Sequence, residues 1–449
     1  MRKAIVPVLV IALWLSLPVL AEANQLDLFG FNARATGLAN AYTAIADGPE
    51  ATFYNPGELI TSNRITAFAG YSYSLPGLSV DLLNRDETDI SETPELKQAK
   101  LPAAGQWINA GVSGGLFDRV YLGLGMQVPV DGASRRRIFS PDRPYFLKYD
   151  TGIFGLTFIP AVGVKVAPNY GIGLGARITM DPLGTFWTEV PTASGEFRAT
   201  TLATSQFTAQ AAPIAGFYAR PFEYLRFGLA FIGQSYAYYH KTMEEKLVAS
   251  DPAGTVEIEY EVKYNFNPRR FVLGVAGQPD EHVLITAELD WVGWSAYVPP
   301  YPSMRLDFSH MNEAGLSYQR PQILEREDAE FDDTWEPHFG VEVKPYKFLS
   351  LRAGYSYQPS PVPDQQGTTT ILDATTNVIA FGAGGNFLGP HGDLVTIDLS
   401  MMDHIISKRW FMKETSIMQE EDPSTNPSFP RVTFRGQYFY SSLTATFRF

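Results

Sequence analysis

Apolar and polar residues alternate with a period of two over much of this chain, and this pattern limits the fold more than any other feature of the sequence. The clearest example is the C-terminal end, where apolar side chains at every second position alternate with polar ones: Leu443, Ala445, Phe447 and Phe449 against Ser442, Thr444, Thr446 and Arg448. Similar alternation runs through residues 256–266 and 394–401. The apolar face would point to the core of a soluble β-sandwich, but to lipid in an outer-membrane barrel. Alternation alone therefore predicts an all-β fold of either kind.

The lengths of the connections separate these two folds. The predicted strands are 64–74, 105–115, 118–129, 153–167, 170–181, 206–219, 225–238, 256–277, 282–296, 336–344, 349–359, 376–386, 393–403 and 433–449. Seven long connections alternate with six short ones between them. Outer-membrane barrels have short periplasmic turns and longer extracellular loops, so the pattern predicts a 14-stranded antiparallel transmembrane β-barrel with both chain ends in the periplasm. The even number of strands requires 256–277 to be one strand that bends at Asn267-Pro268-Arg269-Arg270.

Composition excludes several other classes of protein. Charged residues make up 18% of the chain, against about 25% in soluble domains. Beyond the N-terminal 23 residues, no stretch approaches the roughly 18 apolar residues of a transmembrane helix. The net charge of −13, with one tight basic run at Arg135-Arg136-Arg137, argues against nucleic acid as a partner. The chain has no Cys and its six His residues are scattered, so neither a metal site nor a cofactor is predicted.

The N-terminal residues have the order of a secretory signal peptide. Arg2-Lys3 precedes a mostly apolar run over residues 4–20, and Ala21 and Ala23 provide the small residues of a cleavage site. A retained anchor helix is the alternative, but Pro7 and Pro18 would disturb it. We therefore expect export of the chain and location in the bacterial outer membrane.

Residues 24–60 are rich in Ala and Gly and lack sustained alternation. A fourteen-stranded barrel is wide enough to leave a lumen, so we predict that this segment is a plug at its periplasmic mouth. A flexible periplasmic tail is the alternative. The predicted organisation is a signal peptide at 1–23, an N-terminal hatch or plug at 24–62, and a barrel with long extracellular loops at 63–449.

Three segments resemble the FadL-type outer-membrane transporters of long-chain fatty acids and other hydrophobic compounds. Residues 35–47, followed by Tyr54-Asn55-Pro56-Gly57, resemble the family's hatch with its Asn-Pro-Ala element, although Gly57 stands where Ala is usual and Asn40 where Gly is common. Asp290-Trp291-Val292-Gly293-Trp294-Ser295 is similar to the family's Trp-x-x-Trp-Ser strand end. Arg352-Ala353-Gly354-Tyr355-Ser356-Tyr357, running into residues 360–364, resembles its most specific signature.

The resemblance implies a fourteen-stranded barrel, which agrees with the independent strand count. It further implies that a hydrophobic ligand lands on an extracellular apolar groove, enters the lumen, and leaves sideways through the wall when the hatch shifts. Passage from a pocket to the membrane would avoid exposing apolar surface to water again, at about 25 cal/mol per Å².

Two sets of residues are candidates for ligand binding or gating in the hatch. Leu28, Phe29 and Phe31 stand near the mature N-terminus, which in the family reaches toward the ligand pocket; packing of the hatch against the wall is the alternative role. Asn55 and Pro56 form a turn in which Gly57 would permit a positive φ, as suits a hinge or a simple tight bend.

Charged residues on the lumen-facing phase of the strands form a third set of candidates. Lys165, Arg177 and Arg352 could each pair with a fatty acid carboxylate in a low-dielectric channel. Ion pairs that brace the wall and the hatch are the alternative role, with Glu288, Asp290, Glu342 and Asp398 as the acidic partners on the same phase.

The predicted function is passive uptake of hydrophobic small molecules through a hatch-gated lumen, with long-chain fatty acids as the leading substrate and no enzymatic activity. The alternatives are aromatic or alkane hydrocarbons by the same route, an outer-membrane lipid hydrolase, or a structural barrel. A hydrolase could use Ser113 in Gly111-Val112-Ser113-Gly114-Gly115, but a nucleophile elbow needs a strand-to-helix turn. The expected partners are the ligand, outer-membrane lipid and lipopolysaccharide, and the barrel-assembly machinery that recognises the terminal Phe449; the barrel is expected to be a monomer.

Overall fold

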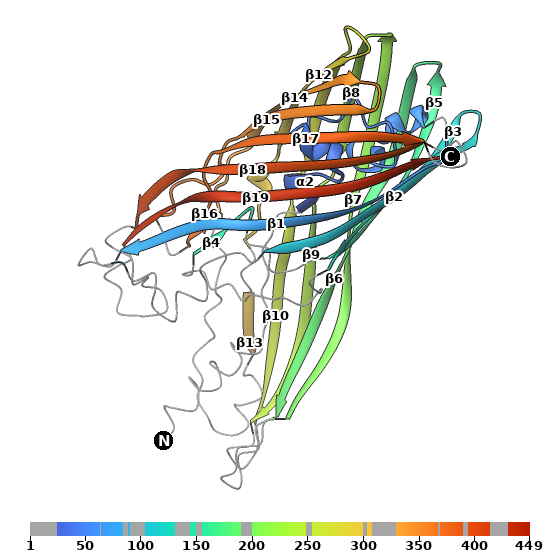
Figure 1. Cartoon of the computed structure of the whole chain (residues 1–449). Coiled ribbons are helices and arrows are strands. Elements are labelled where there is room, and N and C mark those ends of the chain that lie inside the picture. The colour runs from blue at the N-terminus through green and yellow to red at the C-terminus, as the bar shows by residue number, and fades with distance from the viewer. Residues whose placement is uncertain are drawn as a thin grey trace.

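The structure is a computed structural model that describes residues 25–62, 64–83, 89, 104–130, 144–149, 155–189, 200–247, 254–299, 303–307, 329–366, 369–388, 394–413 and 430–449. Fourteen antiparallel strands close into a barrel, which confirms the predicted fold (Figure 1). The wall consists of β1 (Thr66–Leu83), β2 (Gly105–Phe117), β3 (Val120–Pro129), β5 (Leu156–Ala167), β6 (Tyr170–Glu189), β7 (Thr200–Phe222), β8 (Leu225–Ile232), β11 (Arg270–Gly277), β12 (Val283–Val292), β14 (Thr334–Tyr346), β15 (Leu349–Gln358), β17 (Thr376–Leu388), β18 (Leu394–Met412) and β19 (Arg431–Arg448). Pairing of β1 with β19 closes the wall, from Thr66 opposite Arg448 to Leu83 opposite Arg431.

The strands of the wall have apolar outer positions and polar inner ones. In β18, Ile397, Leu399 and Met401 are each 45–49% exposed, whereas the intervening Asp398 and Ser400 are buried. The last strand behaves in the same way, with exposed apolar residues on its outer phase and buried Ser and Thr on its inner phase. A soluble sandwich would bury the apolar phase, so this arrangement is that of a wall facing lipid.

The predicted strand 256–277 divides at its bend, and only one part belongs to the wall. β11 forms the wall, whereas β10 (Gly254–Asn267) pairs with β9 (Ser235–Leu247) and β13 (Ser303–Asp307) in a separate sheet that projects beyond the barrel (Figure 1). Asn265 has a positive φ of 59°, and Pro268 has no N–H to donate to a neighbouring strand. The predicted strand 225–238 divides in a similar way into β8 and the start of β9. Each of the two divided segments gives the wall one strand, so the wall still has the predicted even number of fourteen strands.

The N-terminal segment, residues 25–62, lies within the lumen (Figure 1). It contains α2 (Gln25–Phe29), α3 (Ala33–Gly37), α4 (Ala51–Tyr54) and the 3₁₀ helix η1 (Pro56–Thr61), and nearly all of its residues are buried. Asn32 caps α3, since its side chain accepts a hydrogen bond from the backbone N–H of Ala35 at 2.8 Å. Within the described residues, no helix is long and apolar enough to cross a membrane.

Inward-facing glycines of the wall receive the backbone of this segment. A Cβ atom at Gly228 of β8 would lie 2.1 Å from the Thr43 carbonyl oxygen, and one at Gly354 of β15 would lie 2.3 Å from the Leu38 carbonyl carbon. Added Cβ atoms at further inward glycines would come within 3.3 Å of the segment, namely at Gly111, Gly123, Gly125, Gly163, Gly171, Gly173, Gly216, Gly274, Gly340 and Gly382. We call these twelve positions the glycine seat. They allow the segment to approach strands around most of the wall without steric conflict.

Candidate functional site

A small cavity lies where α2 meets the ends of several distant elements. Its lining combines apolar and charged side chains: Asp27, Leu28, Lys148, Pro268, Arg270, Trp294, Glu336 and Gln358. Lys148 is almost fully buried and forms an ion pair with Asp373 at 3.6 Å. Arg270 lies 3.4 Å from a carboxylate oxygen of Asp290 and 3.9 Å from one of Glu336. Two buried cations therefore border the cavity and keep acidic partners: Asp290 and Glu336 in the wall for Arg270, and Asp373, just before β17, for Lys148.

Three polar atoms of the lining residues have no hydrogen-bond partner in the part of the chain that the structure describes. They are Nε of Arg270, Nε1 of Trp294 and Oε1 of Gln358, and all three residues are buried. A buried donor without an acceptor costs about 1–3 kcal/mol relative to a satisfied one. Arg270 Nε and Trp294 Nε1 are therefore unpaired donors on residues that line a cavity with room for about one water molecule.

An apolar cluster adjoins the cavity through Leu28. It fills the space between α2 and the inner faces of β1 and β17–β19, and it includes Leu28, Phe29, Phe146, Leu372, Val378, Met402, Ile406, Phe411, Phe434 and Tyr438. The lumen at this level is thus apolar on one side of α2 and polar on the other. Such a division suits an amphiphilic ligand.

The three predicted apolar residues of the hatch occupy different surroundings. Leu28 lines the cavity. Phe29 stacks on Tyr440, with ring centroids 4.6 Å apart, and meets His404 edge-on at 5.0 Å. Phe31 packs edge-on against Phe68 of β1, with centroids 5.2 Å apart. The structure therefore brings Leu28 to the cavity and places the two Phe rings in packing contacts with the wall.

The predicted turn at Asn55, Pro56 and Gly57 anchors the segment to the wall. The Asn55 side chain accepts a hydrogen bond from Gly57 N–H at 3.1 Å and donates to the carbonyls of Thr43 at 2.9 Å and Phe217 at 3.0 Å. Gly57 does not use the positive φ that glycine would permit, since among the described glycines a positive φ occurs at Gly30 and Gly436. Glycine is required at position 57 for another reason: a Cβ there would lie 2.9 Å from the Gly216 carbonyl oxygen.

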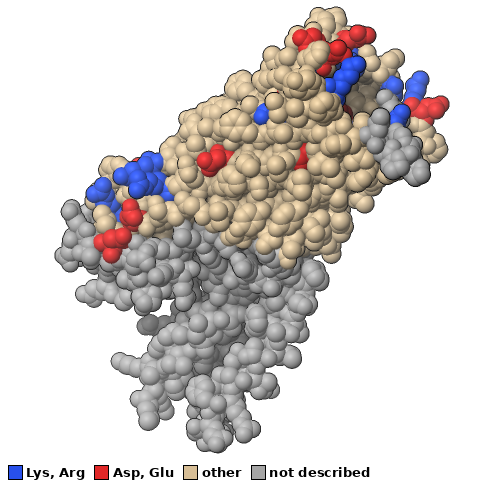
Figure 2. All heavy atoms as spheres, in the orientation of Figure 1, with Lys and Arg blue, Asp and Glu red and all other residues tan. Residues whose placement is uncertain are grey.

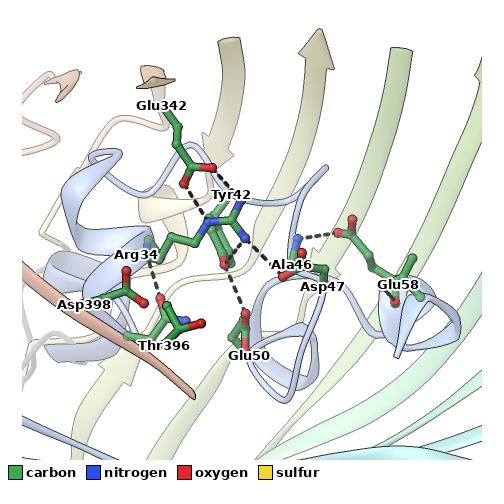
Figure 3. Close-up of polar contacts among 12 residues, drawn as sticks. Arg34, Tyr42, Ala46, Asp47, Glu50, Glu58, Glu342, Thr396 and Asp398 are labelled. Atoms are coloured by element: carbon green, nitrogen blue, oxygen red, sulfur yellow. Dashed lines mark hydrogen bonds and ion pairs between the residues drawn. The ribbon is translucent and has the colours of Figure 1, made fainter. Parts of the chain in front are cut away.

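An ion-pair network joins the N-terminal segment to the wall (Figure 3). Arg34 of α3 contacts Glu342 of β14 at 2.9 Å and Asp47 of the segment at 3.1 Å. Arg352 of β15 contacts the same Glu342 at 2.7 Å and Asp398 of β18 at 2.6 Å. Because both Arg352 contacts are buried carboxylates of the wall, the geometry favours the bracing role of this residue.

The other two candidate cations lie apart from this network. Arg177 of β6 is buried and binds both carboxylate oxygens of Asp27, at 3.1 and 2.9 Å. It therefore acts on the cavity through Asp27, which is one of the lining residues. Lys165 is half-buried near the short turn between β5 and β6, and its backbone N–H donates to the Arg119 carbonyl at 2.8 Å. The structure does not bring Lys165 to the cavity.

Two carboxyl groups are buried inside the N-terminal segment itself. Glu50 accepts a hydrogen bond from the Tyr42 hydroxyl at 3.0 Å, and burial followed by the charge of Asp47 raises the pKa of Glu50 to about 7 (Figure 3). Glu58 accepts a hydrogen bond from Ala46 N–H at 2.7 Å with one oxygen, while its other oxygen has no hydrogen-bond partner among the described residues. Burial raises the pKa of Glu58 well above its usual range. The interior of the segment thus holds carboxyl groups that favour their protonated form.

Most of the cavity lining could not be predicted from the sequence. Lys148, Arg270 and Glu336 come from three separate parts of the chain, and none belongs to a motif. Trp294 and Gln358 are the exceptions: Trp294 stands in the strand-end motif of the family resemblance, and Gln358 lies within the 352–364 stretch that carries the signature. Ser113, the candidate nucleophile of a hydrolase, lies within β2 and contacts the Ser62 hydroxyl at 3.2 Å. It therefore lacks the strand-to-helix turn of a nucleophile elbow.

Comparison with known protein families gave a match over nearly the whole chain. A family model described as outer membrane protein transport protein (OMPP1/FadL/TodX) matches residues 15–449. A comparison with curated protein sequences gave no match.

Several solved structures share the fold at low sequence identity. A Pseudomonas aeruginosa FadL homologue has a TM-score of 0.58 at 15% identity and covers 97% of this chain and 99% of its own. The Pseudomonas putida toluene transporter TodX has a TM-score of 0.55 at 13% identity, with coverages of 94% and 99%. The Ralstonia pickettii toluene transporter TbuX has a TM-score of 0.51 at 14% identity, with the same coverages. At these identities the likeness concerns the fold alone.

Proposed function

Since the chain belongs to the outer membrane protein transport protein family (OMPP1/FadL/TodX), which makes it an outer-membrane channel for hydrophobic compounds, we propose that it takes up long-chain fatty acids. The single observation that carries the choice of substrate is the pair of unpartnered donors at the cavity, Arg270 Nε and Trp294 Nε1. A carboxylate supplies acceptors for both, and the nearby ammonium of Lys148 adds favourable charge. The acyl chain would extend past Leu28 by displacing packed side chains of the apolar cluster.

A hydrocarbon without polar atoms would make poorer use of this site. Toluene or an alkane could fill the apolar cluster, but it would leave the two donors unpaired next to the cavity. Sites that hydrogen-bond a ligand discriminate strongly against analogues lacking the bonding group. The geometry therefore supports the acid over the hydrocarbon.

The N-terminal segment supplies the gate in this proposal. It fills the lumen and packs on the glycine seat. The ion pair between Arg34 and Glu342 holds it to the wall. The Glu288 carboxylate also holds it, by accepting hydrogen bonds from the backbone N–H groups of Tyr42 at 3.1 Å and Thr43 at 2.8 Å. A ligand that enters the cavity contacts α2 directly, so occupancy would displace the start of the segment. Lateral release into the membrane follows from the family resemblance and stays part of the proposal.

The remaining expectations about location and partners also stay predictions. The signal peptide at 1–23 and the basic run Arg135-Arg136-Arg137 lie outside the described residues. Recognition of Phe449 by assembly machinery and a monomeric state are expected on the grounds given above. Family membership supports transport over a hydrolase or a structural barrel.

A single-atom change separates the acid from the hydrocarbon. Trp294→Phe keeps an aromatic ring but removes the N–H donor, and binding of laurate and of dodecane to the purified barrel would be measured for both proteins. We expect laurate affinity to fall about tenfold, as for loss of one bond to a charged group, while dodecane affinity stays unchanged. Trp291→Phe, on the outer phase of the neighbouring strand β12, is the matched control. An equal loss of affinity for laurate and for dodecane would contradict binding of a carboxylate at Trp294. Binding of toluene without binding of laurate would favour aromatic hydrocarbons as the substrate.

A further inference from the structure

Basic side chains gather on the outer face of β18 and β19 at the end opposite to the C-terminus (Figure 2). The pairing of the two strands is interrupted there by a β-bulge: Ile406 lies opposite Gly436 and Arg409 opposite Phe434. Ser407 and Lys408 therefore both face the single residue Arg435, and Lys408 and Arg435 are both exposed. Bulges of this kind redirect side chains. Here the bulge places two cations side by side on the outer surface.

A third cation extends the same surface. Arg431 lies opposite Met412, and its guanidinium carbon lies 5.4 Å from the centre of the Trp410 ring. Trp410 and Met412 are both more than half exposed. The surface formed by Lys408, Trp410, Arg431 and Arg435, which we call the basic rim, thus combines three cations with an exposed aromatic ring.

None of the three cations of the basic rim has an ion-pair partner among the described residues. Asp81 of β1, opposite Thr433, is an acidic neighbour on the same face, and it takes part in none of the ion pairs between described residues. Arg409 on the inner phase provides the contrast, because it contacts Asp364 at 2.9 Å and the Ser360 hydroxyl at 3.1 Å. Like charges opposite each other on neighbouring strands are unfavourable. An anion that binds between Lys408 and Arg435 would relieve this repulsion.

The basic rim lies just beyond the lipid-facing band. In β18 the outer positions from residue 395 to 405 are apolar except for Asp403, and in β19 those from residue 447 to 439 are apolar except for Ser441. A strand tilted by about 40° rises about 2.6 Å per residue along the barrel axis, so a band about 25 Å tall takes about ten residues. Lys408 and Arg435 thus stand at the outer boundary of the hydrocarbon region. This is the extracellular boundary, because the short turns and Phe449 are at the other end of the barrel.

We propose that the basic rim binds the phosphate groups of lipid A in the outer leaflet. Lys408 and Arg435 would share one phosphate, and Arg431, held over Trp410, would bind the anionic sugar region above it. The acyl chains would lie along the outer apolar positions of β18 and β19, beginning at Ile405 and Phe439. This inference rests on the location of the barrel in the outer membrane, and it is independent of the substrate in the lumen.

The test uses the full-length barrel purified in detergent micelles and treated with EDTA to remove bridging divalent cations. Binding of bis-phosphorylated lipid A, added as mixed micelles, would be measured by native mass spectrometry for the wild type and for the Lys408→Gln/Arg435→Gln double variant. We expect at least a tenfold loss of affinity in the variant, and a comparable loss when wild type is given a dephosphorylated lipid A. Arg119→Gln, which removes an exposed cation from the short turn after β2, is the matched control and should bind normally.

Two results would overturn the proposal. Unchanged lipid A affinity in the double variant would exclude the basic rim as the phosphate site. If wild type binds phosphatidylglycerol micelles as tightly as lipid A, the basic rim attracts anionic lipid surfaces in general and is not specific for lipid A. The heat-dependent mobility shift of folded barrels on gels confirms that each variant is folded, and Arg431→Gln provides a second variant if the double one is not.

Discussion

Arg34 of the N-terminal segment and Glu342 of β14 form an ion pair across the boundary between the plug and the wall, with Nε and Oε2 2.9 Å apart. Glu342 is almost fully buried and is shared with Arg352 of the wall. The contact is therefore part of the wall's own ion-pair network, and the segment enters that network through one side chain. This makes Arg34 the natural point at which to loosen the gate without damaging the barrel.

Replacement of Arg34 by Gln should weaken docking of the segment while the barrel still folds. Breaking a buried ion pair can lower stability by about 3–5 kcal/mol. Because Glu342 keeps its contact with Arg352, we expect docking of the segment to weaken by about 3 kcal/mol or less. The expected result is faster amide hydrogen exchange over residues 25–62 and larger ion conductance in planar bilayers. Arg34→Lys, which keeps the charge, is the control; equal exchange in Arg34→Gln and wild type would contradict a latch at this position.

Docking of the segment should weaken as pH rises, because of Glu50. Burial raises its pKa from 4.5 to about 7, so the folded segment holds a proton that an undocked one releases. The contribution of Glu50 is fully present below about pH 4.5 and is lost as pH rises through about 7. The protection factors of residues 25–62, which divide out the base-catalysed intrinsic exchange rate, should therefore be higher at pH 5 than at pH 8.

Glu50→Gln tests this assignment directly, since the amide keeps an acceptor for the Tyr42 hydroxyl and cannot ionise. The difference between pH 5 and pH 8 should shrink in this variant. It should shrink further in Glu50→Gln/Glu58→Gln, because burial also raises the pKa of Glu58. A pH profile identical to that of wild type in the double variant would contradict the assignment.

A methyl group in the glycine seat should displace the segment. In Gly228→Ala the new Cβ would lie 2.1 Å from the Thr43 carbonyl oxygen, and overpacking of this kind costs about 1–3 kcal/mol or more. We expect a folded barrel with raised conductance and faster exchange over the N-terminal segment. Gly277→Ala is the matched control, because nothing lies within 4 Å of its added Cβ. If both variants behave like wild type, the glycine seat does not position the segment.

The wall was predictable from the sequence because its signals are local. Alternation along each strand and the lengths of the connections depend only on neighbouring residues, and they predicted all fourteen strands. The division of 256–277 was missed because the positive φ of Asn265 and the separate sheet of β9, β10 and β13 depend on pairing with distant segments. The bend itself was placed correctly at residues 267–270.

The cavity was less predictable because distant elements build it. Leu28 was a candidate through its place near the mature N-terminus, and it does line the cavity. Lys148 and Arg270 lie far apart in the sequence, and only closure of the barrel brings them to the same space. Arg352 was identified from the sequence as a lumen charge. Whether it binds a ligand carboxylate or braces the wall could be judged only from the positions of Glu342 and Asp398.

The glycine seat also bears on the order of assembly. Its positions are distributed over ten strands of the wall, from β2 to β17, so the complete seat exists only once the strands have paired around the lumen. An N-terminal segment that emerges ahead of every strand has no finished surface on which to settle. The segment that precedes every strand of the wall in the sequence is thus the last part of the described chain to reach its final place.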